Sequence, residues 1–190
     1  MTVHFIHGIH ATRKSATSQL APFFKERGND VIVHNYGVAL ALPRFFGDWL
    51  NEKRAAKIAK RIKDGDTIVA HSNGCTIAFL IQRDHRALNA MILFQAALDN
   101  DVTFTGTDRV LVIYNEKDDV VERSRLARLS SWGNMGRVGH KGAGKNVEQW
   151  DSLDPPHGLP PYDGHCGFVE TGPVLLKAWA LGVEHWYNKE

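Results

Sequence analysis

The sequence has little of what marks several classes of protein. Only two cysteines, Cys75 and Cys166, occur in 190 residues, which is too few for the disulfide framework of a small secreted domain. They do not form a CxxC pair, so they give no zinc-binding pattern. No apolar stretch approaches the roughly 18 residues of a membrane-spanning helix. We therefore expect a soluble globular protein without a structural metal or a disulfide core.

The chain also lacks an excess of charge of either sign. Its 23 basic and 21 acidic side chains leave a formal net charge of +2, whereas a nucleic-acid-binding domain normally has a strongly basic face. The segment 53–63 is locally basic, but its lysines and arginines alternate with alanine and isoleucine. That alternation is typical of the solvated face of an amphipathic helix, which we favour over a binding patch. We expect no nucleic-acid partner and no membrane association.

The first residues do not combine a basic stretch with an apolar core, so they give no sign of a secretory signal peptide. Together with the low cysteine content, this favours a cytoplasmic protein. A chain of 190 residues can bury one core of ordinary size, and a second domain would be cramped. We expect a single domain over residues 1–190.

Short apolar segments without polar alternation recur along the chain, as is typical of strands buried on both faces. Helical patterns separate them. The expected strands are Val3–His7, Asp30–Tyr36, Thr67–Ala70, Ala90–Phe94 and Val110–Tyr114, and the expected helices are Ser15–Arg27, Phe45–Lys63, Asn73–Arg83, Val121–Leu129 and Pro173–Trp186. This alternation predicts an α/β fold, with a doubly wound, mostly parallel sheet and helices on both faces.

The segment 133–170 breaks the regularity, because it contains eight glycines and four prolines. We expect a short strand at Met135–Val138 and a long ordered loop after it. Loops of such length in a compact domain tend to be functional.

The segment 67–78 gives the strongest indication of function. It predicts a buried strand, a sharp turn with the sequence Ala70-His71-Ser72-Asn73-Gly74, and a small apolar helix. A serine on such a turn stands out from the sheet edge, and the positions two residues before and after it must be small. The first N–H groups of the helix favour negative charge, so the N–H of Asn73 is placed to bind an oxyanion. The alternative is that Ser72 only caps the helix.

This turn resembles the Gly-x-Ser-x-Gly nucleophile elbow of the α/β-hydrolases, with Ala70 in place of the first glycine. The segment after the first strand, His7-Gly8-Ile9, resembles the loop that supplies their second oxyanion donor. The resemblance implies that the N–H of Ile9 is this donor. It also implies that His7, Gly8 and His10 lie beside the substrate.

Two further positions resemble the acid and the base of that family. Asp118 lies two residues before an apolar pair that follows the fifth expected strand, with Asp119 as the alternative acid. His165 follows a glycine shortly before the last helix, with His140 as the main alternative base and His157 as another. The order serine, aspartate, histidine is the order of the family.

The resemblance implies a serine hydrolase with a Ser-His-Asp triad that cleaves a small carboxylic ester, or a thioester, through an acyl-enzyme. It implies no cofactor and no metal. It also implies a minimal member that lacks the family's first strands and a large lid, since only a short connection separates Phe94 from Val110. The alternatives are a catalytically inactive binding protein with the same fold, an amidase and an acyltransferase.

Overall fold

One parallel sheet organises the protein. The computed structural model describes residues 2–8, 16–36, 44–126, 133–142, 144 and 146–188. Within these ranges, six strands run in the order β2-β1-β3-β4-β5-β6, and every neighbouring pair is parallel. The strands are β1 (Thr2–Ile6), β2 (Asp30–His34), β3 (Thr67–His71), β4 (Leu88–Phe94), β5 (Thr107–Tyr114) and β6 (Val147–Asp151). The helices are α1 (Ala16–Glu26), α2 (Arg44–Ala59), α3 (Asn73–Asp84), α4 (Asp119–Leu126), α5 (Met135–Val138), α6 (Gly167–Glu170) and α7 (Pro173–Tyr187).

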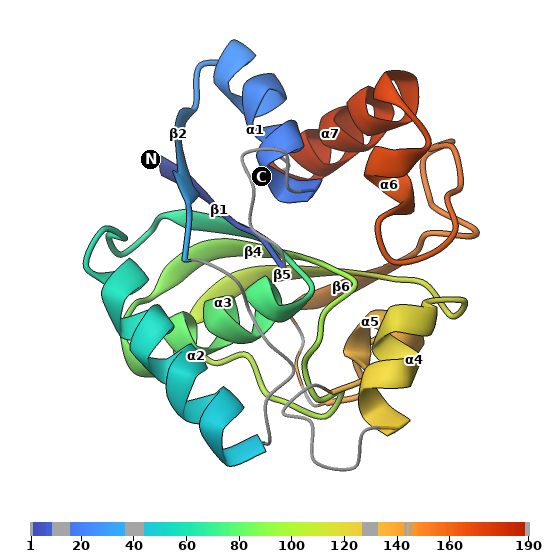
Figure 1. The fold of residues 1–190 in the computed structure, drawn as a ribbon. Coiled ribbons are helices and arrows are strands. Elements are labelled where there is room, and N and C mark those ends of the chain that lie inside the picture. The colour runs from blue at the N-terminus through green and yellow to red at the C-terminus, as the bar shows by residue number, and fades with distance from the viewer. Residues whose placement is uncertain are drawn as a thin grey trace.

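Helices cover both faces of the sheet, which explains why its central strands are apolar throughout. Figure 1 shows α1 and α7 on one face and α2 and α3 on the other. Each face has its own apolar core, because alternate side chains of a strand point to opposite faces. In β3, for example, Val69 belongs to the core beneath α1 and α7, while Ile68 and Ala70 belong to the core beneath α2 and α3.

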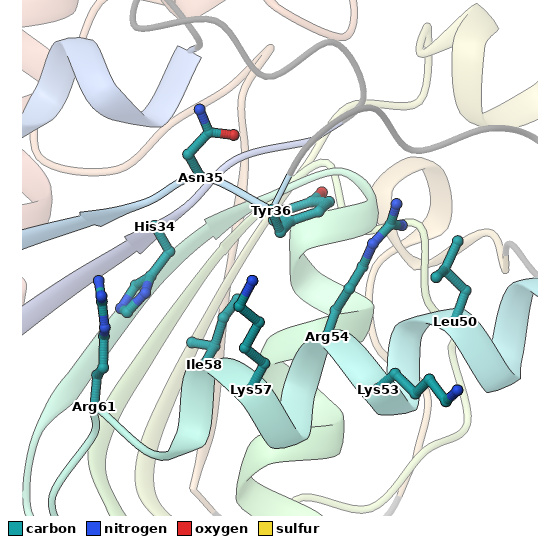
Figure 2. Close-up of a pocket in the computed structure, with 9 residues that line it drawn as sticks. All are labelled: His34, Asn35, Tyr36, Leu50, Lys53, Arg54, Lys57, Ile58 and Arg61. Atoms are coloured by element: carbon teal, nitrogen blue, oxygen red, sulfur yellow. The ribbon is translucent and has the colours of Figure 1, made fainter.

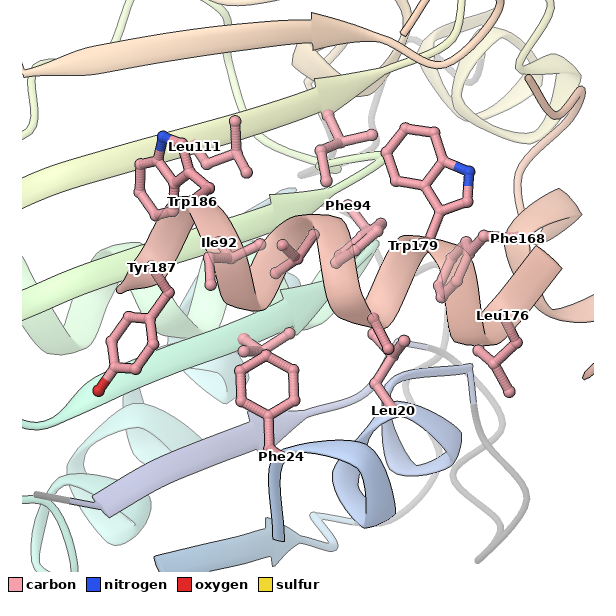
Figure 3. Packing of buried hydrophobic residues seen from close by; sticks show 14 of the residues in the cluster. Leu20, Phe24, Ile92, Phe94, Leu111, Phe168, Leu176, Trp179, Trp186 and Tyr187 are labelled. Carbon is pink, nitrogen blue, oxygen red and sulfur yellow. The ribbon is translucent and has the colours of Figure 1, made fainter. Parts of the chain in front are cut away.

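Aromatic side chains fill much of the core beneath α7 (Figure 3). Phe94, the last residue of β4, stacks on Phe168 of α6 with ring centroids 4.6 Å apart. Trp179 of α7 and Tyr162 pack edge-to-face at 4.8 Å. These contacts fix the segment between β6 and α7, which carries His165, against the end of the sheet.

The structure confirms the α/β class and the doubly wound parallel sheet. The connection from β4 to β5, residues 95–106, contains no helix or strand, in agreement with the expectation that a large lid is missing. In the described part of the chain, no helix is both long and apolar enough to span a membrane.

Two predictions in the glycine-rich segment are wrong. Met135–Val138 is the short helix α5 rather than a strand, and β6 lies within the segment that was expected to be a loop. The helix packs close to the end of β4, where a Cβ on Gly136 would lie 2.3 Å from the carbonyl carbon of Gln95. The last strand was missed because it forms an edge of the sheet and is only partly buried, so its sequence has no continuous apolar run.

Candidate active site

Ser72 lies on a strained turn between β3 and α3. Its backbone angles are φ 54° and ψ −126°, and positive φ costs a residue with a Cβ on the order of 1–3 kcal/mol. The backbone N–H of Ser72 donates to the carbonyl of Phe94 at 3.0 Å, and its carbonyl accepts from the N–H of Ala97 at 3.2 Å. The Ser72 side chain makes no capping hydrogen bond to α3. The turn therefore has the form of a nucleophile elbow rather than of an ordinary helix cap.

Two glycines allow the segments around Ser72 to approach one another. A Cβ on Gly74 would lie 2.5 Å from the backbone carbonyl oxygens of both Ile6 and His7. A Cβ on Gly8 would lie 2.8 Å from the Cβ of Ser72. Ala70 is fully buried in the core beneath α2 and α3. The loop after β1 therefore lies directly against the elbow, as the resemblance implied.

Asp118 and His165 form a partly buried hydrogen-bonded pair. Oδ2 of Asp118 lies 2.7 Å from Nδ1 of His165, and the Asp118 side chain is fully buried. The second carboxylate oxygen, Oδ1, accepts the backbone N–H groups of Val120 and Val121 at 3.1 and 3.0 Å. The carboxylate is thus fixed at the start of α4 and accepts the Nδ1 proton of His165. Nε2 of His165 is then the ring nitrogen that does not contact Asp118.

His71, the residue before Ser72, contacts His165 directly. The ring centroids of His71 and His165 are 4.7 Å apart, and Nε2 of His71 lies 2.9 Å from the carbonyl oxygen of His165. Burial, with His165 adding to it, lowers the pKa of His71 to about 3. The neutral ring therefore donates its Nε2 proton to that carbonyl. In this way β3 holds the His165 loop beside the elbow.

The alternative bases have other roles. His140 is buried, and its Nε2 lies 2.7 Å from the carbonyl oxygen of Val102. His157 packs edge-to-face against Trp150. Among the described residues, the histidine that Asp118 binds is His165. Asp119, the alternative acid, is exposed at the start of α4.

The two cysteines are free thiols. Burial raises the pKa of Cys75 well above its ordinary value, and burial raises the pKa of Cys166 to about 11. Neither side chain is a thiolate at neutral pH, so neither competes with Ser72 as a nucleophile. Cys75 is fully buried in the core beneath α2 and α3, as expected.

The loop after β1 is held from one side by Tyr36. The Tyr36 hydroxyl lies 2.5 and 3.0 Å from the carbonyl oxygens of His7 and Gly8 and shares its one proton between them, and its ring stacks on His7 at 4.4 Å. His7 is only 2% exposed and supports the loop, and its expected contact with substrate stays a prediction. Ile9 and His10, the other expected members of this loop, lie outside the described residues.

Comparison with solved structures identifies the fold. No protein-family model and no curated protein sequence matches this chain. A putative hydrolase of the α/β superfamily from Xanthomonas campestris pv. campestris aligns with a TM-score of 0.56 and 14% identity, over 97% of this chain and 98% of that one. The mouse α/β hydrolase domain-containing protein 10 gives 0.62 and 12% over 97% and 88%, and Est1E from Butyrivibrio proteoclasticus gives 0.55 and 14% over the same shares. The fold is that of the α/β-hydrolases.

Sequence reasoning missed a polar network that supports the His165 loop of this α/β-hydrolase fold. Gln95, just after β4, donates from Nε2 to the Tyr162 hydroxyl at 2.6 Å. Asn115, just after β5, donates from Nδ2 to the Ser152 hydroxyl at 2.7 Å and to the Tyr162 carbonyl at 3.0 Å. The sequence could have indicated this network, because Gln95 and Asn115 each directly follow a buried strand at the carboxyl edge of the sheet.

Two further features indicate that the backbone and side chain of Gln95 are constrained. Its φ is 41°, and its Oε1 is buried without a hydrogen-bond partner among the described residues. Strained backbone and unsatisfied polar atoms persist where the surrounding structure fixes them, often beside functional sites. Gln95 therefore ties the Tyr162 segment to the same end of β4 that holds Ser72.

We expect the protein to lose stability in mild acid because of its buried neutral histidines. The pKa of His71 is lowered by burial and by His165 to about 3, and that of His34 by burial and by His4 to about 4, against an ordinary value of 6.5. The unfolded chain therefore binds protons that the folded chain does not, and stability falls as pH drops from about 6.5 towards 4. Thermal melts across this range should show a decrease in Tm on the order of 5 °C.

A pair of variants tests the source of this acid sensitivity. His71→Gln keeps an N–H donor for the His165 carbonyl but cannot titrate, so its Tm should depend less steeply on pH than that of the wild type. His85 is exposed, and His85→Gln should reproduce the wild-type slope. Equal slopes in all three proteins would show that His71 does not contribute.

Proposed function

We propose that this protein is a serine hydrolase that cleaves small carboxylic esters, or thioesters, through an acyl-enzyme. Ser72 is the nucleophile, His165 the general base and acid, and Asp118 the residue that orients His165. The observation that carries the proposal is the 2.7 Å hydrogen bond between Asp118 Oδ2 and His165 Nδ1, which lies beside the strained turn of Ser72. Proteins named as α/β hydrolases that have the same fold add support.

In the first half of the proposed reaction, Nε2 of His165 accepts the hydroxyl proton of Ser72 while Oγ attacks the acyl carbonyl carbon. The imidazolium that forms is stabilised by the Asp118 carboxylate. His165 then donates the proton to the leaving alcohol or thiol as the tetrahedral intermediate collapses. In the second half, His165 activates a water molecule that hydrolyses the acyl-enzyme.

The proposed oxyanion hole combines two backbone N–H groups. Asn73 is the first residue of α3, so its backbone N–H lies at the positive end of the helix dipole. The side chain of Asn73 exchanges hydrogen bonds with Asn51 of α2, both 3.2 Å long, and this contact fixes the start of α3. The second donor is the N–H of Ile9. Gly8, which precedes Ile9, lies directly against Ser72, and this close approach supports placing the Ile9 N–H at the elbow.

An ester is the preferred substrate class because an alcohol leaves more easily than an amine. The short β4–β5 connection supports a substrate that reaches Ser72 without displacing a lid. The geometry leaves an inactive binding protein as the second candidate, since the fold alone does not determine activity. The strain at Ser72 favours the enzyme, because a binding protein has no need for it.

Labelling with a fluorophosphonate probe distinguishes the two candidates. An activated serine attacks the phosphorus and becomes covalently modified, so the wild type should be labelled within minutes and Ser72→Ala should not. Ser152 is a buried serine whose hydroxyl is hydrogen-bonded to Asn115, and Ser152→Ala should remain labelled. A wild-type protein that is folded but unlabelled would contradict the proposed function.

A further inference from the structure

A pocket of about 600 Å³ lies between the end of β2 and α2. Figure 2 shows its wall, with His34 and Tyr36 coming from the β2 end and side chains of α2 and the following turn facing them. We call it the α2 pocket. Its volume lies in the range of sites for small molecules. None of the residues proposed for catalysis lines it.

The lining is strongly basic. It includes Lys53, Arg54, Lys57 and Arg61, and none of the described residues that line it is an aspartate or glutamate. Lys53, Lys57 and Arg61 recur every four residues, which places them on one side of the helical segment. These cations belong to the basic segment 53–63, which was expected to form a solvated helix face.

The acidic residues of α2 lie elsewhere. Asp48 and Glu52 line a different pocket, together with Thr76 and Arg83 of α3. The helix therefore separates its charges, with carboxylates towards α3 and cations towards the end of β2. In a chain whose formal net charge is only +2, this separation creates a local excess of positive charge that attracts anions.

A buried relay of polar side chains supports one wall. Oδ2 of Asp66 lies 3.0 Å from Nε2 of His4, and Nδ1 of His4 lies 2.8 Å from Nε2 of His34. Burial alone would raise the pKa of Asp66, but hydrogen bonds from the backbone N–H groups of Lys63 and Thr2 and from His4 hold it below its ordinary value. An ionised Asp66 accepts from His4, which then accepts from His34, leaving Nδ1 of His34 as the acceptor nitrogen of its ring.

His34 is therefore oriented by its contacts and does not supply the charge of the pocket. Burial, with His4 and Arg61 adding to it, lowers the pKa of His34 to about 4, so its ring is neutral. The positive charge comes from the α2 segment.

The rest of the lining is apolar or aromatic. Ile58 and Leu50 contribute aliphatic surface, and Tyr36 contributes its ring, with the Arg54 guanidinium 5.0 Å from the ring centroid. Such a surface suits the uncharged part of an organic ligand. A row of cations along one wall suits an oxyanion that carries more than one negative charge, as in a phosphoryl group.

We propose that the α2 pocket binds a small soluble organic phosphate that carries at least two negative charges and an aromatic or apolar part. The cations of α2 bind the phosphoryl oxygens, and Tyr36 with its aliphatic neighbours contacts the remainder. Anionic lipid headgroups share the phosphoryl chemistry, but the Tyr36 ring and its aliphatic neighbours favour a free molecule with an organic part.

Calorimetric titration of the full chain at low ionic strength tests the proposal, with sodium pyrophosphate and ATP as probes. Both should bind to the wild type, and ATP should bind more tightly because its nucleoside adds contacts with the apolar wall. Lys57→Glu and Arg61→Glu should each weaken binding by about tenfold or more, the usual effect of removing a charge-assisted hydrogen bond. Lys60→Glu is the matched control, because Lys60 is exposed and does not line the pocket.

Three results would overturn the proposal. The first is that neither probe binds to a wild-type protein that is shown to be folded by its thermal melt. The second is that Lys60→Glu weakens binding as much as Lys57→Glu, which would indicate a diffuse effect of charge. The third is that phosphatidylcholine vesicles containing phosphatidic acid bind while pyrophosphate and ATP do not, which would indicate a membrane-facing surface. The binding test does not use labelling of Ser72, so a negative binding result would not contradict the proposed hydrolase activity.

Discussion

Replacing His165 by alanine should lower kcat for the hydrolysis of p-nitrophenyl acetate by at least about 10⁴-fold, the scale of removing a catalytic histidine from a serine hydrolase. The imidazole is proposed to carry the proton in every step, and Asp118 binds it through Nδ1 at 2.7 Å. Because the histidine acts in the transition state rather than in substrate binding, KM should change little. Steady-state kinetics on the purified variant measure both constants.

His140→Ala is the matched control. Its ring bonds the carbonyl oxygen of Val102 at 2.7 Å, and its loss would leave a buried acceptor unsatisfied at a cost of about 1–3 kcal/mol. We therefore expect a lower Tm with kcat almost unchanged at temperatures where the variant is folded. Loss of activity in His140→Ala, together with retained activity in His165→Ala, would reverse the assignment of the base.

Replacing Gly74 by alanine should destabilise the elbow strongly, even though alanine is the better helix former by about 1 kcal/mol. The added Cβ would lie 2.5 Å from the carbonyl oxygens of Ile6 and His7, and these are backbone atoms that cannot rotate away. Relieving the clash requires β1 and α3 to move apart, at a cost of about 3 kcal/mol. Differential scanning calorimetry should show Tm lowered by about 10 °C, and fluorophosphonate labelling should be lost.

Gly28→Ala provides the comparison for this substitution. Gly28 has φ +84°, and a Cβ there would have no atom within 4 Å. Its substitution should cost only the backbone strain, about 1 kcal/mol, with labelling retained. A Gly74→Ala protein with the stability and labelling of Gly28→Ala would show that the β1 loop does not pack against Ser72 as described.

Most of the fold could be predicted from the sequence because its strands are buried on both faces. Segments such as Thr67–His71 and Leu88–Phe94 have almost continuous apolar runs, and runs of that kind identify central parallel strands. The edge strand β6 and the helix α5 could not be predicted in this way. In β6 a single residue, Trp150, is fully buried, and α5 depends on contacts of its backbone with residues 96 and 98, which are distant in sequence.

The candidate site could be predicted in part. The small residues around Ser72 reflect a steric requirement that is visible in the sequence, and the structure places Gly74 and Gly8 where that requirement applies. The pairing of Asp118 with His165 rather than His140 depends on how the segment after β6 folds back, which no local pattern specifies. The supporting contacts of Tyr36, Gln95 and Tyr162 also join distant segments, so only the tertiary structure reveals them.

The parallel sheet has a consequence for how the protein folds. β1 and β2, the earliest strands along the described chain, pair in parallel with Thr2 opposite Asp30. Because every neighbouring pair in the described sheet is parallel, none of these pairs can form as a local hairpin. Each pairing must first close a long loop, and sheets of this kind form slowly. The turn at Ser72 depends on its hydrogen bonds to the Phe94 carbonyl and from the Ala97 N–H, and its strain can be maintained only once those bonds exist. We therefore expect the elbow to form late in folding, after β4 has joined the sheet.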